Sequence, residues 1–345
     1  MSAVSQVLNL ENMRSIASAA VSLVSWRTLA LILALLNLKN LPLAWHFRLL
    51  YHFLGNVRLK PSAPFFPKGR AIVDARGNPT HPVFVPCTVK SRTPLLETDY
   101  NLHKSNSTYF TDLDVSRTAL VTRLYSPGVG LVSKELDQEF LLASQKEGKK
   151  PPRKLPVMVV LGSVYCSFKR EIKPYELYEM QSRVISWDKK WMYILTTFLR
   201  PAKRAGGEKT LLATAISKYV VKKGRLTVAP ERLLRTGGFL PARPVDSQVP
   251  SALDSSVETS AIGTPASGEG ITATGVDGSL VRQALKISED QMPDQDTLEQ
   301  EKKANSDSWS PEEWPWERIE EERLRGLAVV EPYINLDAKL EHEVT

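Results

Sequence analysis

A series of strand-forming segments in the middle of the chain limits its possible folds more than any other feature. Residues 157–168 are β-branched and apolar, 176–187 alternate in polarity, and 191–200 follow after a short polar turn. A further β-rich segment spans 210–230. Short connections between such segments are typical of antiparallel strands. The pattern predicts three or four antiparallel strands, with a bulge at Gly162.

One long helix is expected ahead of these strands. From about Asn106 to Tyr125, apolar side chains recur at near-helical spacing. The Ser-Pro-Gly run at 126–128 predicts the end of this helix. Residues 126–155 are then a Lys-rich insertion, expected to form a solvated surface loop. This order of elements predicts an α+β fold, in which an antiparallel sheet wraps around one long central helix.

The composition changes on both sides of this body, which spans residues 72–242. A proline-rich linker at 59–71 precedes it. Residues 243–308 follow it and are rich in Ser, Thr, Gly and Ala. Because such a segment buries too little apolar surface to offset the entropy lost on ordering, we expect a disordered linker there.

The C-terminal residues 309–345 carry the signals of an amphipathic helix and a tail. Ser310 is the predicted N-cap, Pro311 the first helical residue and Glu313 the partner in a capping box. One face of this helix is apolar and contains Trp316, Ile319 and Leu327. Two interpretations remain open: the helix docks back on the body, or it binds a partner or regulates the body.

The N-terminal residues 1–58 form an apolar segment of helical character. Residues 16–36 are apolar over about the length that a bilayer requires, but Arg27 lies in the middle. An arginine at mid-bilayer costs roughly 2.5–3.5 kcal/mol. Three interpretations therefore remain open: a weak membrane anchor through 16–36, a hydrophobic hairpin in the membrane interface, and a helix packed on the body.

Charge is distributed unevenly along the chain. Residues 1–245 hold 37 Lys and Arg against 16 Asp and Glu, whereas 246–345 hold 8 against 22. A basic body suits coenzyme A phosphates, an acidic carrier protein or a membrane surface, although it is equally compatible with a solvated surface. No nucleic-acid-binding motif accompanies it. Two cysteines and five scattered histidines lack disulfide or metal-site spacing, so we expect a reducing, cytoplasmic-facing location, no metal and no other cofactor.

Polar and aromatic residues cluster where the central helix is expected to begin: Asp99, His103, Asn106 and Tyr109. The N–H groups of a first helical turn lack helical partners, so they can polarise a carbonyl oxygen or hold an oxyanion. A carboxylate facing that carbonyl, as Asp99 would, attacks it or activates water. A purely structural interpretation is also open, in which Asn106 or Ser105 caps the helix and Asp99 orders a turn.

Residues 99–109 follow the pattern D-x-N-x-H-x-x-N-x-x-Y, which resembles the signature of hotdog-fold thioesterases of the 4-hydroxybenzoyl-CoA thioesterase-like group. Residues 167–198 look like the strand region of thioesterase superfamily member six-like proteins, a branch that tends to carry an apolar N-terminal segment. Residues 213–230 are similar to the closing strands of fungal relatives, some of which accompany polyketide or lipopeptide biosynthesis. The resemblance covers roughly residues 80–240.

This resemblance implies a thioesterase that acts on an acyl-CoA or a carrier-protein-bound acyl chain, as a homodimer and without a cofactor. It makes Asp99 the candidate base or nucleophile, with His103 and Asn106 shaping the loop and the helix start. On the helix itself, Tyr109 and Ser107 are the expected substrate-binding residues.

Two features differ from the family pattern: one pair of residues and one insertion. Lys104 and Ser105 replace the small or apolar pair often found between the His and the Asn. The basic insertion at 126–155 would, on a functional interpretation, cap an acyl pocket or meet coenzyme A phosphates. A catalytically silent acyl-binding or membrane-associated scaffold protein is the alternative function, since the hotdog fold does not settle activity.

Overall fold

The computed structural model describes residues 25–56, 72–74, 77–146, 155–204, 206–242 and 295–344, together with a few single positions. The elements in chain order are α2 (Trp26–Leu36), η1 (Leu38–Asn40), α3 (Ala44–Asn56), η2 (Pro82–Phe84), β1 (Cys87–Arg92), η3 (Leu95–Glu97), α4 (Thr108–Lys146), β2 (Val157–Phe168), β3 (Leu177–Trp187), β4 (Trp191–Arg200), β5 (Thr210–Lys223), β6 (Leu226–Val228), α5 (Pro230–Thr236), α8 (Gln295–Ser306) and α9 (Trp316–Val344).

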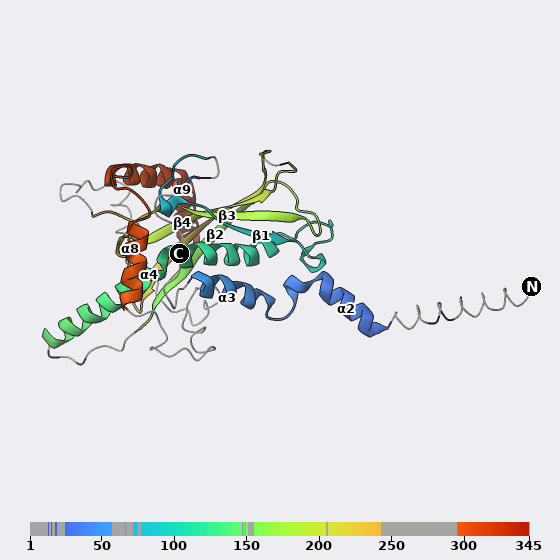
Figure 1. Cartoon of the computed structure of the whole chain (residues 1–345), viewed down its shortest axis with the longest axis horizontal. Coiled ribbons are helices and arrows are strands. Elements are labelled where there is room, and N and C mark those ends of the chain that lie inside the picture. The colour runs from blue at the N-terminus through green and yellow to red at the C-terminus, as the bar shows by residue number, and fades with distance from the viewer. Residues whose placement is uncertain are drawn as a thin grey trace, which may run out of the picture.

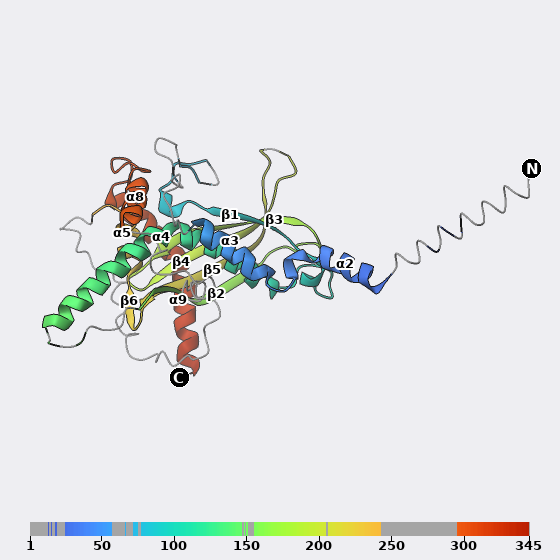
Figure 2. The same cartoon turned by 60° about the horizontal axis from the view of Figure 1, so that its bottom comes forward.

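The strands form one antiparallel sheet that curls around the long helix α4 (Figures 1 and 2). Its order is β1-β3-β4-β5-β2, and β6 pairs with β5. The expected strands, the α+β class and the hotdog arrangement are confirmed. However, β2 pairs with β5 rather than with β3, so the connection from β2 to β3 crosses between distant strands.

The predicted bulge in β2 is confirmed, because the β2–β5 register shifts between Leu161 and Ser163. The intervening Gly162 lies against the Trp191 ring. A Cβ atom there would come within 2.4 Å of that ring. A side chain at this position would therefore displace either the ring or the bulge.

The predicted end of the central helix at 126–128 is wrong. Helix α4 continues through Pro127 to Lys146, so most of the expected solvated loop is helical. Pro127 and Gly128 are buried, and a Cβ on Gly128 would lie 2.2 Å from the Leu233 carbonyl oxygen of α5. The Ser-Pro-Gly run is thus a packing site, where burial against α5 offsets the helix-breaking tendency of proline.

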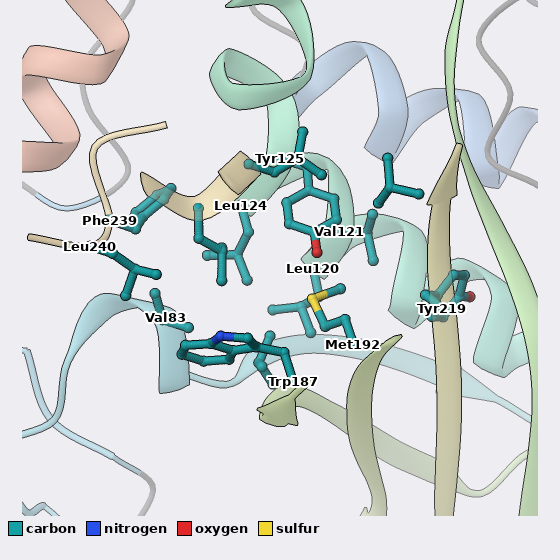
Figure 3. Close-up of a cluster of buried hydrophobic side chains, with 14 of the residues drawn as sticks. Val83, Leu120, Val121, Leu124, Tyr125, Trp187, Met192, Tyr219, Phe239 and Leu240 are labelled. Carbon is teal, nitrogen blue, oxygen red and sulfur yellow. The ribbon is translucent and has the colours of Figure 1, made fainter. Parts of the chain in front are cut away.

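The main hydrophobic core lies between α4 and the sheet (Figure 3). Leu120 and Leu124 of α4 face Trp187 of β3 and Met192 of β4. All four are buried. Since each such side chain contributes roughly 1.5–3 kcal/mol when it leaves water, this layer fixes α4 against the sheet.

The N-terminal helices differ in how they meet the body. Helix α3 packs along α4, and the Asn56 side-chain amide donates to the Ala119 carbonyl at 3.0 Å and to the Thr122 hydroxyl at 2.9 Å. Helix α2 lies away from the sheet and buries none of its residues (Figures 1 and 2). No helix in the described part of the chain is long and apolar enough to cross a membrane.

The C-terminal part departs from two expectations. The last residues of the expected 243–308 linker form helix α8, which packs on α4 through Leu298, while residues 243–294 lie outside the described residues. Helix α9 begins at Trp316 rather than at Pro311, because the Ser310 hydroxyl accepts from the Glu312 N–H in a local turn.

Helix α9 docks on the sheet, as one of the two interpretations held. Its Leu327 and Val330 pack against Ile185 and Tyr193 of β3 and β4. Gly326 allows the close approach, because a Cβ there would lie 1.8 Å from the Ile185 carbonyl oxygen.

Candidate active site

The cluster recognised in the sequence lies in the loop between η3 and α4. A bridge between Thr98 and Lys104 closes this loop of residues 98–104, which we call the catalytic loop after the role that the sequence motif predicts for it. The Asp99 N–H donates to the His103 carbonyl at 2.9 Å, and Leu102 takes a left-handed conformation with φ of 60°. The loop is therefore a tight turn with a defined shape.

Asp99 has a structural role in this turn, as the alternative interpretation held. Its Oδ1 accepts a hydrogen bond from the Asn101 N–H at 2.9 Å. The same oxygen lies 3.6 Å from His103 Nδ1, so the two side chains form an ion pair when the imidazole is protonated. The side chains of Asp99 and His103 are 24% and 29% exposed, so both remain partly open to solvent.

The first turn of α4 differs from the expectation that its N–H groups lack partners. Helix α4 begins at Thr108, and the N–H groups of Thr108, Tyr109 and Phe110 donate to the carbonyls three residues before them. Those amides are therefore not free. The N–H groups of Asn106 and Ser107, by contrast, have no acceptor among the residues that the structure describes. They form a pair of adjacent exposed donors at the foot of the helix.

The expected substrate-binding residues have different surroundings. Ser107 and Asn106 are exposed, and neither caps the helix by its side chain. Tyr109 is buried on the inner face of α4, with ring centroids 4.9 Å from Phe168 and 5.0 Å from Phe198. In the single chain Tyr109 thus belongs to the core beneath the catalytic loop.

A group of charged side chains, which the sequence analysis did not connect, lies next to this loop. We call it the buried ionic cluster: Lys39, Arg48, Glu97, Lys104 and Asp112. Asp112 is fully buried and accepts from Lys39 at 2.8 Å, Lys104 at 2.9 Å and Arg48 at 3.1 Å. Glu97 accepts from Lys104 at 2.6 Å and Lys39 at 2.8 Å.

The electrostatics of this cluster favour its ionised form. Burial by itself raises the pKa of Asp112, but Lys39, Lys104 and Arg48 outweigh burial and hold that pKa well below its usual range. Burial lowers the pKa of Lys39, and Asp112 and Glu97 oppose this shift. The Tyr178 hydroxyl donates to Asp112, and burial together with that carboxylate raises the tyrosine pKa.

Sequence analysis missed this cluster, although one signal for it was present. The Lys104 departure from the family pattern is explained by full burial of its side chain between Glu97 and Asp112. A charged residue replacing a small or apolar one needs a buried partner of opposite charge. Nothing local in the sequence, however, links Lys39 to Asp112, 73 residues later.

The described residues contain no group of three or more His, Cys, Asp and Glu side chains that could hold a metal ion. The catalytic loop and the residues after it offer a carboxylate, an imidazole and two backbone donors.

Comparison with known proteins identifies the family. A family model of the thioesterase-like superfamily matches residues 93–235, which include the catalytic loop, α4 and β2 to β6. Thioesterase lcsJ of Purpureocillium lilacinum is 33% identical over 328 residues, which are 92% of each chain. The chain belongs to the thioesterase-like superfamily.

Two further fungal relatives match a shorter part of the chain. The probable thioesterase atnL of Emericella nidulans is 36% identical over 60% of this chain and 69% of its own. Thioesterase poxG of Penicillium oxalicum is 36% identical over 63% of this chain and 72% of its own. The chain is thus similar to several fungal proteins that are named as thioesterases.

Proposed function

We propose that this member of the thioesterase-like superfamily hydrolyses an acyl thioester, with Asp99 as the base or nucleophile. The observation that carries the proposal is the catalytic loop itself. A partly exposed carboxylate, Asp99, stands at one end of it. Two adjacent N–H groups without acceptors among the described residues, those of Asn106 and Ser107, follow its other end.

These groups have distinct tasks in the proposed reaction. The N–H groups of Asn106 and Ser107 donate to the thioester carbonyl oxygen and stabilise the negative charge that develops there. Asp99 either takes a proton from a water molecule that attacks the carbonyl carbon, or attacks that carbon itself to give an anhydride that water then hydrolyses. His103, 3.6 Å from Asp99 Oδ1, orients the carboxylate. The products are a carboxylic acid and a free thiol.

The proposed substrate is an acyl-CoA or an acyl chain on a carrier protein, both of which carry phosphate. Exposed Lys169 and Arg170 support this proposal, because they lie close to the catalytic loop. The Lys104 N–H donates to the Ile172 carbonyl at 2.8 Å, which joins the loop to the segment that holds the two cations.

We further propose, from the likeness to the fungal thioesterases, that the reaction serves secondary-metabolite biosynthesis.

We also propose a homodimer in which a second copy completes the acyl site. The long edge strand β2 supports it, because this strand pairs only with β5 among the described residues. Its Tyr165 and Phe168 side chains are exposed. A strand at the edge of a sheet has N–H and C=O groups that favour pairing with another chain. Light scattering on the purified chain tests this proposal, which predicts twice the monomer mass.

Helix α2 suits a membrane surface. Seven apolar side chains around most of it are exposed: Trp26, Leu29, Leu31, Ile32, Leu33, Leu35 and Leu36. So large an exposed apolar surface requires an apolar surrounding. We propose that α2 lies in the interface of a membrane, with Arg27 at its polar edge. Flotation with phosphatidylcholine and phosphatidylserine vesicles tests this proposal.

A catalytically silent acyl-binding or scaffold protein is the second candidate. The hydrogen bond from the Asn101 N–H to Asp99 favours it, since that bond gives the carboxylate a purely structural task. Thiol release from a panel of acyl-CoAs and acyl carrier proteins separates the two candidates. The enzyme releases thiol and loses this activity in Asp99→Asn, whereas the binder retains its ligand and releases no thiol.

A further inference from the structure

The N-terminal segment is tied to the catalytic loop by two side chains near η1. Asn37 is buried, and its Oδ1 accepts from the Leu96 N–H of η3 at 2.8 Å. Lys39 donates to the Arg92 carbonyl at 3.2 Å and to Glu97 at 2.8 Å. Leu96 and Glu97 directly precede the catalytic loop, so residues 37–39 fix the point from which the loop starts.

Lys39 also joins the loop to the central helix. Its ammonium group contacts Glu97 on one side and Asp112 on the other, both at 2.8 Å. Glu97 stands before Asp99, and Asp112 lies in the second turn of α4, just beyond Asn106 and Ser107. One cation from the N-terminal segment therefore links η3, which precedes Asp99, to α4, which follows the two backbone donors of Asn106 and Ser107.

We propose that Lys39 is a positioning residue for the catalytic loop, which makes the N-terminal segment a working part of the active site. This inference rests on the proposed function. Small displacements of catalytic groups are costly, since about 1 Å reduces turnover roughly 100-fold. A residue that sets this spacing therefore affects kcat without touching the substrate.

The charges of the buried ionic cluster make this inference testable in a folded protein. With Lys39 present, three cations face the two carboxylates of Glu97 and Asp112. Lys39→Met leaves Arg48 and Lys104 opposite those two carboxylates, so the remaining charges balance. Helix α3 also keeps its own contacts with α4, including the bond from Arg48 to Asp112 at 3.1 Å.

The first readout is hydrogen exchange of the full-length protein, which requires no activity. The N–H groups of Asp99, Leu102 and Ser105 are all hydrogen-bonded within or beside the loop, at 2.8 to 3.0 Å. We expect Lys39→Met to speed their exchange and to leave strand β4 unchanged. Lys218→Met is the matched control, because the Lys218 side chain is 14% exposed against 13% for Lys39 and binds Asp337 of α9 instead.

The second readout is thiol release from the best acyl thioester. Lys39→Met is expected to lower kcat about tenfold with little change in KM, as for a misplaced catalytic group. Lys39→Arg keeps the cation and is expected to restore most of the loss, while Lys218→Met stays near the wild-type value. Unchanged loop exchange, or faster exchange with unchanged kcat, overturns the inference. A wild-type protein inactive on every thioester refutes the proposed function instead, and exchange alone then decides whether Lys39 holds the loop.

Discussion

From the buried ionic cluster we predict that Asp112→Asn lowers the free energy of unfolding strongly and in a pH-dependent way. This change removes one of the two carboxylates, so that Lys39, Arg48 and Lys104 face Glu97 alone. Removing one partner of a buried ion pair costs about 3–5 kcal/mol. For a domain of this size the melting temperature is expected to fall by roughly 6–20 °C, at about 2–4 °C for each kcal/mol.

The pH dependence follows from the lowered pKa of Asp112. Burial raises this pKa, but the three cations outweigh burial and hold it well below the ordinary value. A carboxyl of this kind contributes its full stability above its unfolded pKa of about 3.9 and loses it as the pH falls further. The stability gap between wild type and Asp112→Asn is therefore constant from pH 7 to 5 and narrows below about pH 4.

Urea unfolding followed by tryptophan fluorescence measures this gap. Asp337→Asn serves as the control, because its side chain is 25% exposed, against 0% for Asp112, and pairs with Lys218. Since Asp337 keeps part of its contact with water, this change is expected to cost less than Asp112→Asn. An Asp112→Asn variant within about 1 kcal/mol of wild type at pH 7, or a gap that does not narrow in acid, would refute the assignment of Asp112 as the ionised centre of the cluster.

Three further predictions concern other parts of the molecule. Gly326→Ala places a Cβ 1.8 Å from the Ile185 carbonyl oxygen and should lower the free energy of unfolding by about 1–3 kcal/mol. Gly55→Ala is the control and should not lower it, because no atom lies within 4 Å of the added Cβ. Replacing Lys169 and Arg170 by Ala should raise KM severalfold for an acyl-CoA but not for the matching N-acetylcysteamine thioester, which lacks phosphates; equal effects on both would contradict a phosphate contact. Leu31→Glu with Leu35→Glu should abolish vesicle flotation, and unchanged flotation would exclude α2 as the contact.

Local patterns in the sequence predicted most of the body. The predicted strands 157–168 and 191–200 agree with β2 and β4 to the residue, because runs of β-branched and aromatic side chains bounded by turns are a local signal of strands. The ends of the helices were predicted less well. Pro127 and Ser310 both appear as helix signals in the sequence, but tertiary packing of α4 and a local turn at Ser310 decide the outcome.

For the candidate site, the motif predicted that Asp99 and His103 lie together in a loop before the central helix, and they do. The turn formed by Asp99 and Asn101 follows from local chemistry, whereas the catalytic role of this loop stays a prediction. The buried ionic cluster could not be predicted in the same way, because Lys39 and Asp112 meet only after α3 packs along α4. A long-range ion pair leaves no periodic signal in a single sequence.

Thiol release by wild type and by Asp99→Asn tests the central claim most directly. Asn keeps the size of the side chain, and its amide oxygen can still accept from the Asn101 N–H, so the turn is expected to persist. The proposed mechanism predicts that wild type turns over at least one acyl-CoA or acyl carrier protein and that the folded variant is slower by about 100-fold or more. A folded Asp99→Asn protein that turns over as fast as wild type would contradict it.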